Sequence, residues 1–338
     1  MLLLLLGAAA AFYRLIYSPA HAVHGEAAYV LPRSLDVVDT PAEVRSVIAH
    51  LKAGERVEVM ARTAHWSKLR IAGNESGWVE TKYLLDAATY RRGEVLLKAL
   101  QESVPQAAGH TLAATNLHLE ASRDSVTLGE LAENRPLEIF ARRLVDRPAS
   151  ASSSGASGAA HPRDVWYLVR AKPQAGWVLG RFVDLDVPPG IAPYAQGINM
   201  VAWLVLKTVP DAGKNVPEYL VADRVGAESV DFNHVRVFTW WVKNHKYVTA
   251  FVESGLAGYF PISARQMTDA RYYAQPSPYF RLRLLDTDGH RYQRVYGLFD
   301  TIVRPVGTVE GWDSDAMPVP AERAQSRRTR NKRSHKRL

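Results

Sequence analysis

The stretch Val57–Leu84 reads VEVMARTAHWSKLRIAGNESGWVETKYL, and its landmarks occur a second time further along the chain. Between Leu137 and Leu185 the chain carries LEIFARRLV, then WYLVR, then AGWVLGRFVDL, in the same order. The tryptophans of each copy are twelve residues apart in the first and eleven in the second: Trp66 and Trp78, then Trp166 and Trp177. Unrelated stretches rarely agree in order, spacing and tryptophan placement, so the sequence indicates an internal duplication.

Each copy has the alternation of half-buried β-strands. Val57 and Val59 alternate with charged residues, and Leu137 and Ile139 do the same. The segments that begin with tryptophan predict a second strand. In the first copy, the Asn-Glu-Ser-Gly sequence at 74–77 predicts the turn before a third strand. We therefore expect a small all-β unit in each copy.

These landmarks resemble the bacterial SH3-like (SH3b) domain. The resemblance rests on a Gly-Glu-x-Val-x-Val strand at 54–59, a Trp-x-x-[VL]-Arg strand, Gly-Trp-Val and a closing Tyr/Phe-[LV]. It covers roughly residues 27–86 and 112–187. The second copy departs from the pattern, because Glu-Asn-Arg-Pro at 133–136 replaces Ala-Gly-Glu-Arg and a long loop follows.

The resemblance implies small barrels that recognise peptidoglycan or an envelope protein through shallow grooves. The candidate ligand-binding residues are Trp66, Arg70, Trp78, Trp166, Arg170 and Trp177. A second interpretation stays open for the tryptophans, because aromatic side chains of small barrels commonly pack in the core. If both copies reach one polymer, their linkage increases the overall affinity.

Positive charge is concentrated at the C-terminus. The chain has a formal net charge of +8. Residues 321–338 hold eight Arg and Lys against Glu322, which leaves the rest of the chain close to neutral. We expect a basic disordered tail at 317–338 that binds anionic lipid or a wall polymer, or that is merely solvated. Its polyanion-binding candidates are Arg327, Arg328, Arg330, Lys332, Arg333, Lys336 and Arg337.

Residues 1–22 are predicted to be a signal peptide or a membrane anchor. An apolar run begins at Leu2, Arg14 interrupts it, and Ala-His-Ala at 20–22 offers a small-x-small cleavage site. No basic segment precedes the run, as a signal peptide would ordinarily require. We expect a location in the periplasm or cell envelope, free or anchored to the inner membrane.

The remaining segments complete a mainly β fold: two SH3-like small barrels joined by a helix, plus a C-terminal antiparallel β barrel or sandwich. After the first SH3b-like domain (23–86), residues 87–111 predict a helical connector that ends before Pro105. The second SH3b-like domain (112–187) contains a Ser-, Ala- and Gly-rich insertion at 148–163, which we expect to be disordered. In the C-terminal domain (188–316), turns at 243–245 and 286–289 predict two β-hairpins.

The sequence lacks the residue patterns that several kinds of catalysis and cofactor binding require. The chain has no cysteine, no Gly-x-Ser-x-Gly, no P-loop and no dinucleotide fingerprint, and its histidines lack metal-ligand spacing. We therefore expect no cofactor and no metal site. A paired-carboxylate glycosidase stays open in the C-terminal domain, against the expectation that these residues face solvent at strand ends. The candidates are Asp223, Glu228, Asp231 and Glu253, with His234 nearby.

The adjacent tryptophans Trp240 and Trp241 form the most conspicuous aromatic pair. Neighbouring strand residues point to opposite faces, so at least one of the two is expected outside the main core. Sugar stacking, partner binding and packing beneath a loop are all open interpretations.

The arrangement as a whole resembles uncharacterised envelope proteins with SH3-type domains found in acidobacteria. The segments most particular to that group are AGWVLGRFVDLDVPPGI, VRVFTWWVKNHKYVTAFVESGLAGYFPI and YFRLRLLDTDGHRYQRVYGLFDTIVRPVGTVEGW. The leading hypothesis is a non-enzymatic envelope-binding or scaffold protein that recognises peptidoglycan or an envelope partner. The alternatives are a wall-directed enzyme with its site in the C-terminal domain, and a nucleic-acid binder that acts through the tail.

Overall fold

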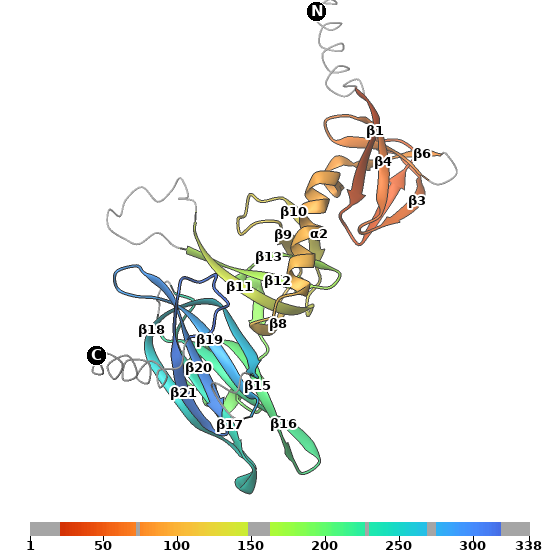
Figure 1. The fold of residues 1–338 in the computed structure, drawn as a ribbon. Helices are drawn as coiled ribbons and strands as arrows, with labels where there is room; N and C mark the ends of the chain where they lie inside the picture. The colour runs from red at the N-terminus through yellow and green to blue at the C-terminus, as the bar shows by residue number, and fades with distance from the viewer. Residues whose placement is uncertain (1–20, 72–74, 148–162, 227–229, 269–274, 319–338) are drawn as a thin grey trace, which may run out of the picture. The chain divides into compact units, whose positions relative to one another are not determined.

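The computed structural model describes residues 21–71, 75–147, 163–226, 230–268 and 275–318. Most of three predicted segments lies outside these residues: 1–20 of the signal peptide or anchor, 148–162 of the insertion and 319–338 of the tail. The described part is dominated by β-strands, with one α-helix and three antiparallel seven-stranded sheets (Figure 1). The prediction of a mainly β chain is confirmed.

The chain divides into two compact units. The first comprises Met1–Gln101, Ala113–Glu133 and Lys172–Val178, and the second comprises Glu102–Leu112, Asn134–Ala171 and Leu179–Leu338.

The first sheet lies in the first unit and follows the order β3-β2-β6-β5-β4-β1-β7. Its strands are β1 (His21–Val30), β2 (Ser34–Val38), β3 (Val47–Lys52), β4 (Arg56–Arg62), β5 (Trp66–Arg70), β6 (Ser76–Glu80) and β7 (Leu84–Asp86). Val57 and Val59 are buried on the core side, as their alternation with charged residues predicts. Burial of alternate apolar residues on one face supplies the main driving force for this small sheet.

The second sheet repeats the strand order of the first. Its strands are β8 (Ala107–Thr111), β9 (Thr115–His118), β10 (Thr127–Leu131), β11 (Pro136–Asp146), β12 (Arg163–Ala171), β13 (Gln174–Leu179) and β14 (Val183–Leu185). Those strands of the second sheet that belong to the first unit run β10-β9-β13, which corresponds to β3-β2-β6 of the first sheet. Those of the second unit run β12-β11-β8-β14, which corresponds to β5-β4-β1-β7. The duplication seen in the sequence therefore extends to strand order.

A β-bulge occurs at the same place in both copies. The register slips by one residue after the second buried residue of β4 and of β11. The slips lie between Val59 and Ala61 and between Ile139 and Ala141. A bulge bends its strand and increases the local twist, which helps a short sheet to close around its core.

The glycine of each Gly-Trp-Val segment is required by close strand approach. A Cβ on Gly77 would lie 2.4 Å from Val37 Cγ1 of β2. A Cβ on Gly176 would lie 2.6 Å from the carbonyl oxygen of His118, at the end of β9. Any side chain at these positions would separate the two strands, so both copies need glycine there.

The helix α2 (Ala87–Gln101) follows β7, at the position predicted for the helical connector. Asp86 caps its first turn, because Oδ1 accepts the backbone N–H groups of Ala88 and Thr89, each at 2.9 Å. The Thr89 hydroxyl donates to Asp86 Oδ2 at 2.7 Å. The bonds from Thr89 lower the pKa of Asp86, because they stabilise its ionised form.

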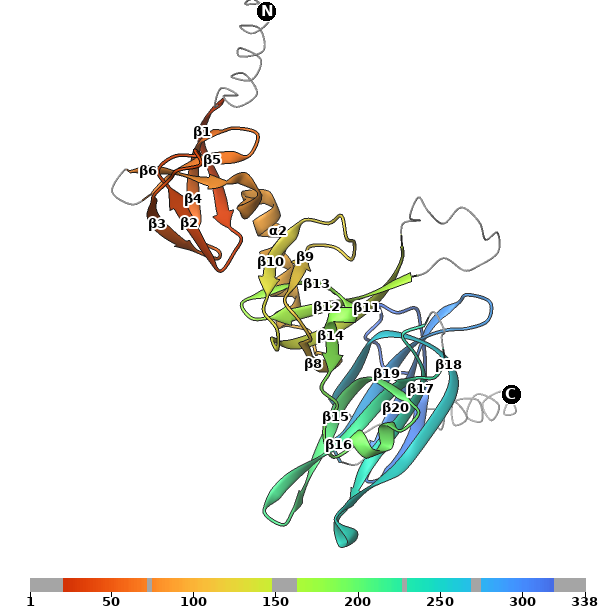
Figure 2. The ribbon, with the colours of Figure 1, turned by 180° about the vertical axis from the view of Figure 1, so that it is seen from behind.

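The third sheet is a meander in the order β15-β16-β17-β18-β19-β20-β21, entirely within the second unit (Figure 2). Its strands are β15 (Asn199–Asp211), β16 (Lys214–Arg224), β17 (Phe232–Trp241), β18 (Lys246–Met267), β19 (Ser277–Leu285), β20 (Arg291–Phe299) and β21 (Ile302–Glu310). Both predicted hairpins are confirmed: β17–β18 turns through His245 (φ 47°), and β19–β20 through Gly289 (φ 80°). The sheet curls so that β15 also contacts β18 and β19.

Candidate functional site

Two tryptophans share the outer face of β5 and β6 in the first sheet. Ser67 and Leu69 point to the core, so Trp66, Lys68 and Arg70 point outward because strand side chains alternate. On β6, Gly77 and Val79 are buried, which places Trp78 and Glu80 on the same outer face. We call this set the tryptophan face: Trp66, Lys68, Arg70, Trp78 and Glu80.

The register of β5 and β6 sets the spacing of these side chains. Trp66 lies opposite Glu80, and Lys68 lies opposite Trp78. The two indoles are therefore diagonal neighbours, with Cα atoms roughly 7–8 Å apart in this geometry. Both tryptophans are half-buried, and Lys68 lies between them in the pairing. The result is a surface with two aromatic rings and one cation on a rigid pair of strands.

The loop before β3 extends the tryptophan face. The Arg45 guanidinium lies 5.2 Å from the centre of the Trp66 ring, within cation–π range. Val44 and Val47, on either side of this arginine, are exposed. Val47 pairs with Val38 of β2, which in turn pairs with Trp78. Apolar side chains, buried at Val38 and exposed at Val47, thus continue from Trp78 to the sheet edge.

The charges of this surface are partly compensated. Arg70 Nε lies 3.1 Å from Glu58 Oε2, in an exposed pair. Lys82 Nζ lies 2.5 Å from Glu80 Oε2, and this hydrogen bond raises the pKa of Lys82. Within the described residues, Lys68 makes no ion pair. It is therefore available to an acidic group of a ligand.

The equivalent residues of the second copy are packed inside the protein. Trp166 has 1% of its surface exposed and Trp177 has 8%. Arg170 is 11% exposed at its side chain; its Nε donates to Glu138 Oε2 at 2.5 Å, which raises the pKa of Arg170, and the guanidinium lies over the Phe140 ring. Of the four predicted tryptophans, only Trp66 and Trp78 offer ring surface to a ligand.

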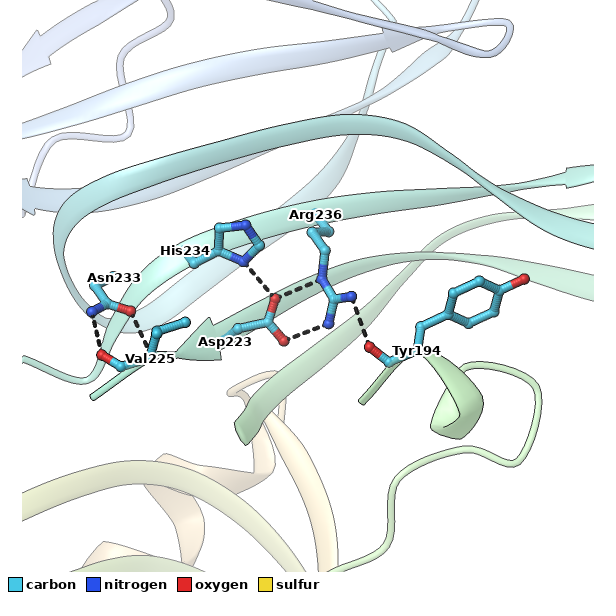
Figure 3. A network of polar contacts seen from close by, with 6 residues as sticks. All are labelled: Tyr194, Asp223, Val225, Asn233, His234 and Arg236. Carbon is cyan, nitrogen blue, oxygen red and sulfur yellow. Dashed lines mark hydrogen bonds and ion pairs between the residues drawn. The ribbon is translucent and has the colours of Figure 1, made fainter. Parts of the chain in front are cut away.

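A buried polar network occupies the third sheet (Figure 3). Asp223 is fully buried, with hydrogen bonds from Arg236 Nε (2.7 Å to Oδ2) and Nη2 (2.8 Å to Oδ1). His234 Nδ1 lies 2.9 Å from Asp223 Oδ2, and Arg236 Nη1 donates to the Tyr194 carbonyl. The expectation that Asp223 faces solvent is wrong, because the bidentate arginine compensates its burial.

The other carboxylates considered for catalysis are also held by arginines. Asp231 is buried: Oδ2 accepts the Phe260 N–H at 3.0 Å, and Oδ1 lies 3.5 Å from Arg142 Nη1. Burial raises the pKa of Asp231 despite this arginine. Glu253 pairs with Arg294 and accepts the Tyr296 hydroxyl. Asp231 therefore does not face solvent either, and Glu228 lies outside the described residues.

Neither a metal cluster nor a membrane-spanning helix is present in the part of the chain that the structure describes. No group of three or more His, Asp or Glu side chains there has the arrangement of a metal site. None of its helices is both long and apolar enough to cross a bilayer.

Comparison with known families identifies the first copy. The family model for the bacterial SH3 domain matches residues 36–85, which include the whole tryptophan face. This confirms the SH3b resemblance for the first copy; the match does not extend to the second. A comparison with curated proteins gives no match.

Solved structures give only distant similarity. NlpC2 from Trichomonas vaginalis is 10% identical with a TM-score of 0.18, and the alignment covers 69% of this chain and 98% of that chain. An NlpC/P60 family protein from Bacillus cereus is 9% identical with a TM-score of 0.22, covering 68% and 94% of the two chains. At these TM-scores the similarity supports no conclusion about this chain.

Proposed function

We propose that this protein is a non-enzymatic cell-envelope binding protein whose tryptophan face binds peptidoglycan. One observation carries the proposal: two half-buried indoles lie diagonally on β5 and β6, beside Lys68, within the segment that matches the bacterial SH3 domain. The match to a bacterial SH3 domain supports a role at the cell wall and a location in the cell envelope.

The chemistry of the tryptophan face suits a polymer of sugars and acidic peptides. Indole rings give large, rigid contact area at low cost in side-chain entropy, and the faces of sugar rings stack on them. Lys68 and Arg45 lie beside the rings and suit the carboxylates of wall peptides. The surface is open, so we expect weak binding by a single face.

We assign wall binding to the first copy alone. Two equivalent sites would increase the overall affinity, but Trp166 and Trp177 are buried in the second copy. The second copy keeps the strand order and the glycine of the first, while its tryptophans are buried. In this proposal the second copy has a structural role.

Co-sedimentation of the full-length chain with purified sacculi tests the proposal. The W66A/W78A double variant should lose most of the pelleted fraction at high salt, where adhesion through the basic tail is screened. W241A is the matched control, because Trp241 is an exposed tryptophan of the third sheet. Unchanged pelleting of W66A/W78A, or an equal loss in W241A, would contradict the assignment.

A further inference from the structure

Two hairpins of the third sheet end side by side in an exposed cluster. We define the hairpin tip as Asp211–Lys214, between β15 and β16, and Trp241–Lys246, between β17 and β18. Both ends lie at the lower edge of the third sheet in the two views (Figure 1, Figure 2). Contacts from Asp211 to Trp240 and His245 join the two turns.

Hydrogen bonds give the hairpin tip a defined structure. Asp211 Oδ2 accepts the Trp240 indole N–H at 2.7 Å and lies 2.7 Å from His245 Nδ1. The Trp240 ring packs edge-on against Tyr247 at 4.8 Å. Trp240 is thereby held on the sheet, and Trp241 projects to the other face because adjacent strand residues alternate. The expectation that at least one of these tryptophans lies outside the core is confirmed.

The exposed part of the hairpin tip is both apolar and basic. Trp241 is 45% exposed and Val242 is 42% exposed, although both are large apolar residues. Lys214, Lys243 and Lys246 of the tip are also exposed, and Lys246 Nζ lies 5.4 Å from the centre of the Trp241 ring. The one acidic side chain of the tip, Asp211, is engaged by Trp240 and His245. The tip thus combines two exposed apolar side chains with three exposed lysines, and its one carboxylate is already engaged.

We propose that the hairpin tip docks on a bilayer containing anionic phospholipids, with Trp241 and Val242 entering the headgroup region. Tryptophan favours this region because its ring is apolar while its N–H can still be hydrated. Lysine stems cross the same zone and leave their amines at the phosphates. Segments that bind at the membrane interface combine apolar and aromatic side chains with lysines and arginines in this way.

A sugar polymer fits this surface less well. The tryptophan face offers two indoles in register on neighbouring strands, whereas the tip offers a single exposed indole beside Val242 and lysines. An exposed apolar side chain at the end of a turn gains free energy from transfer into lipid. The observations therefore favour the membrane as the partner of this tip.

The absence of cysteine makes a direct test straightforward. In the full-length chain, Val242→Cys provides a unique site for a nitrobenzoxadiazole label, whose emission reports the polarity around it. The matched control is Val95→Cys, another exposed valine, on helix α2. Vesicles of phosphatidylcholine with phosphatidylglycerol should shift the emission of the label at 242 to the blue and increase it. Vesicles of phosphatidylcholine alone should have little effect, and the label at 95 should not respond.

A charge variant sharpens the same test. K243S/K246S in the V242C background should weaken the vesicle response roughly tenfold to a hundredfold, because each lysine contributes to attraction by anionic lipid. Since the label reports its own surroundings, attachment through another segment of the chain leaves its signal unchanged. No response at 242, an equal response to both kinds of vesicle, or a response to sacculi alone would overturn the proposal. The wall-binding test does not depend on this result, because it uses Trp66 and Trp78.

Discussion

Trp66 and Trp166 lie on equivalent strands, β5 and β12, of two sheets with the same strand order, yet one is half-buried and the other has 1% of its surface exposed. Trp78 and Trp177 differ in the same direction. The residues that shape the strands are shared by both copies: the glycine before Trp78 or Trp177, the bulge, and the cross-strand Glu–Arg pair. The duplication thus preserves the framework, while the use of the outer face differs between the copies.

The largest expected effect comes from removing the buried tryptophan. Trp166→Ala should lower the free energy of unfolding by about 3–5 kcal/mol, because it leaves a cavity in place of a fully buried indole. Trp66→Ala should change stability by less than half as much and should instead weaken sacculus binding. Urea titration followed by circular dichroism measures the first effect. Equal destabilisation by both variants would remove the distinction between the copies.

The glycines should behave alike in both copies. Gly77→Ala and Gly176→Ala should each cost about 1–3 kcal/mol, because the new methyl group would overlap a neighbouring strand. Gly93→Ala is the control: its Cβ would meet Leu128 at an ordinary 3.4 Å. Alanine also favours helix α2, so this change should stabilise the protein by about 1 kcal/mol. A neutral result for only one of Gly77 and Gly176 would show that the copies differ in strand packing too.

The Glu–Arg pairs of the two copies should differ modestly in their contribution to the free energy of unfolding. Glu138→Ala should cost about 1.5 kcal/mol, because it removes a charge-assisted hydrogen bond to the largely buried Arg170. Glu58→Ala should cost less than about 1 kcal/mol, because Arg70 remains hydrated when its exposed partner is removed. Thermal unfolding of the two variants under the same conditions gives the comparison, and the reverse order would contradict it.

The smallest expected change in stability comes from replacing Asp86 or Asp186, the aspartates at the ends of the two copies. Asp86 caps helix α2, whereas Asp186 precedes Val187 and two prolines, and its Oδ1 pairs with His110 Nδ1 at 2.7 Å. Asp86→Ala should cost about 1 kcal/mol at neutral pH. Asp186→Ala should cost less, because no helix end depends on it.

The cap also has a defined pH dependence. The folded state lowers the pKa of Asp86, so its contribution is complete above the ordinary value of about 4 and is lost as the pH falls through the lower folded value. The difference in unfolding free energy between wild type and Asp86→Ala should therefore shrink below about pH 4. Asp86→Asn, which keeps an acceptor without the charge, should show a smaller pH dependence than wild type. A constant difference down to pH 2 would contradict the role of the charged cap.

Local patterns predicted much of the fold. Alternation located the strands around Val57 and Ile139, amphipathic spacing located α2, and turn residues such as Gly289 located the hairpins of the third sheet. These features depend on neighbours within a few positions along the chain. The burial of the carboxylates was harder to predict, because the partners of Asp223 and Asp231 depend on strand pairing and on contacts between residues far apart in the sequence. Arg142 is 88 positions from Val230, the carbonyl that it contacts next to Asp231.

The sequence by itself determined that one pattern of strand residues, tryptophans and glycines occurs twice, since order, spacing and glycine placement are local properties of the chain. Only the tertiary structure decided which tryptophans remain available: strand alternation gives each indole the same face in both copies, but not what packs over that face. Burial depends on segments brought together by folding, and their distance along the chain leaves no periodic signal. For the same reason, the exposed tip at Trp241 became visible only when two hairpins were placed next to each other.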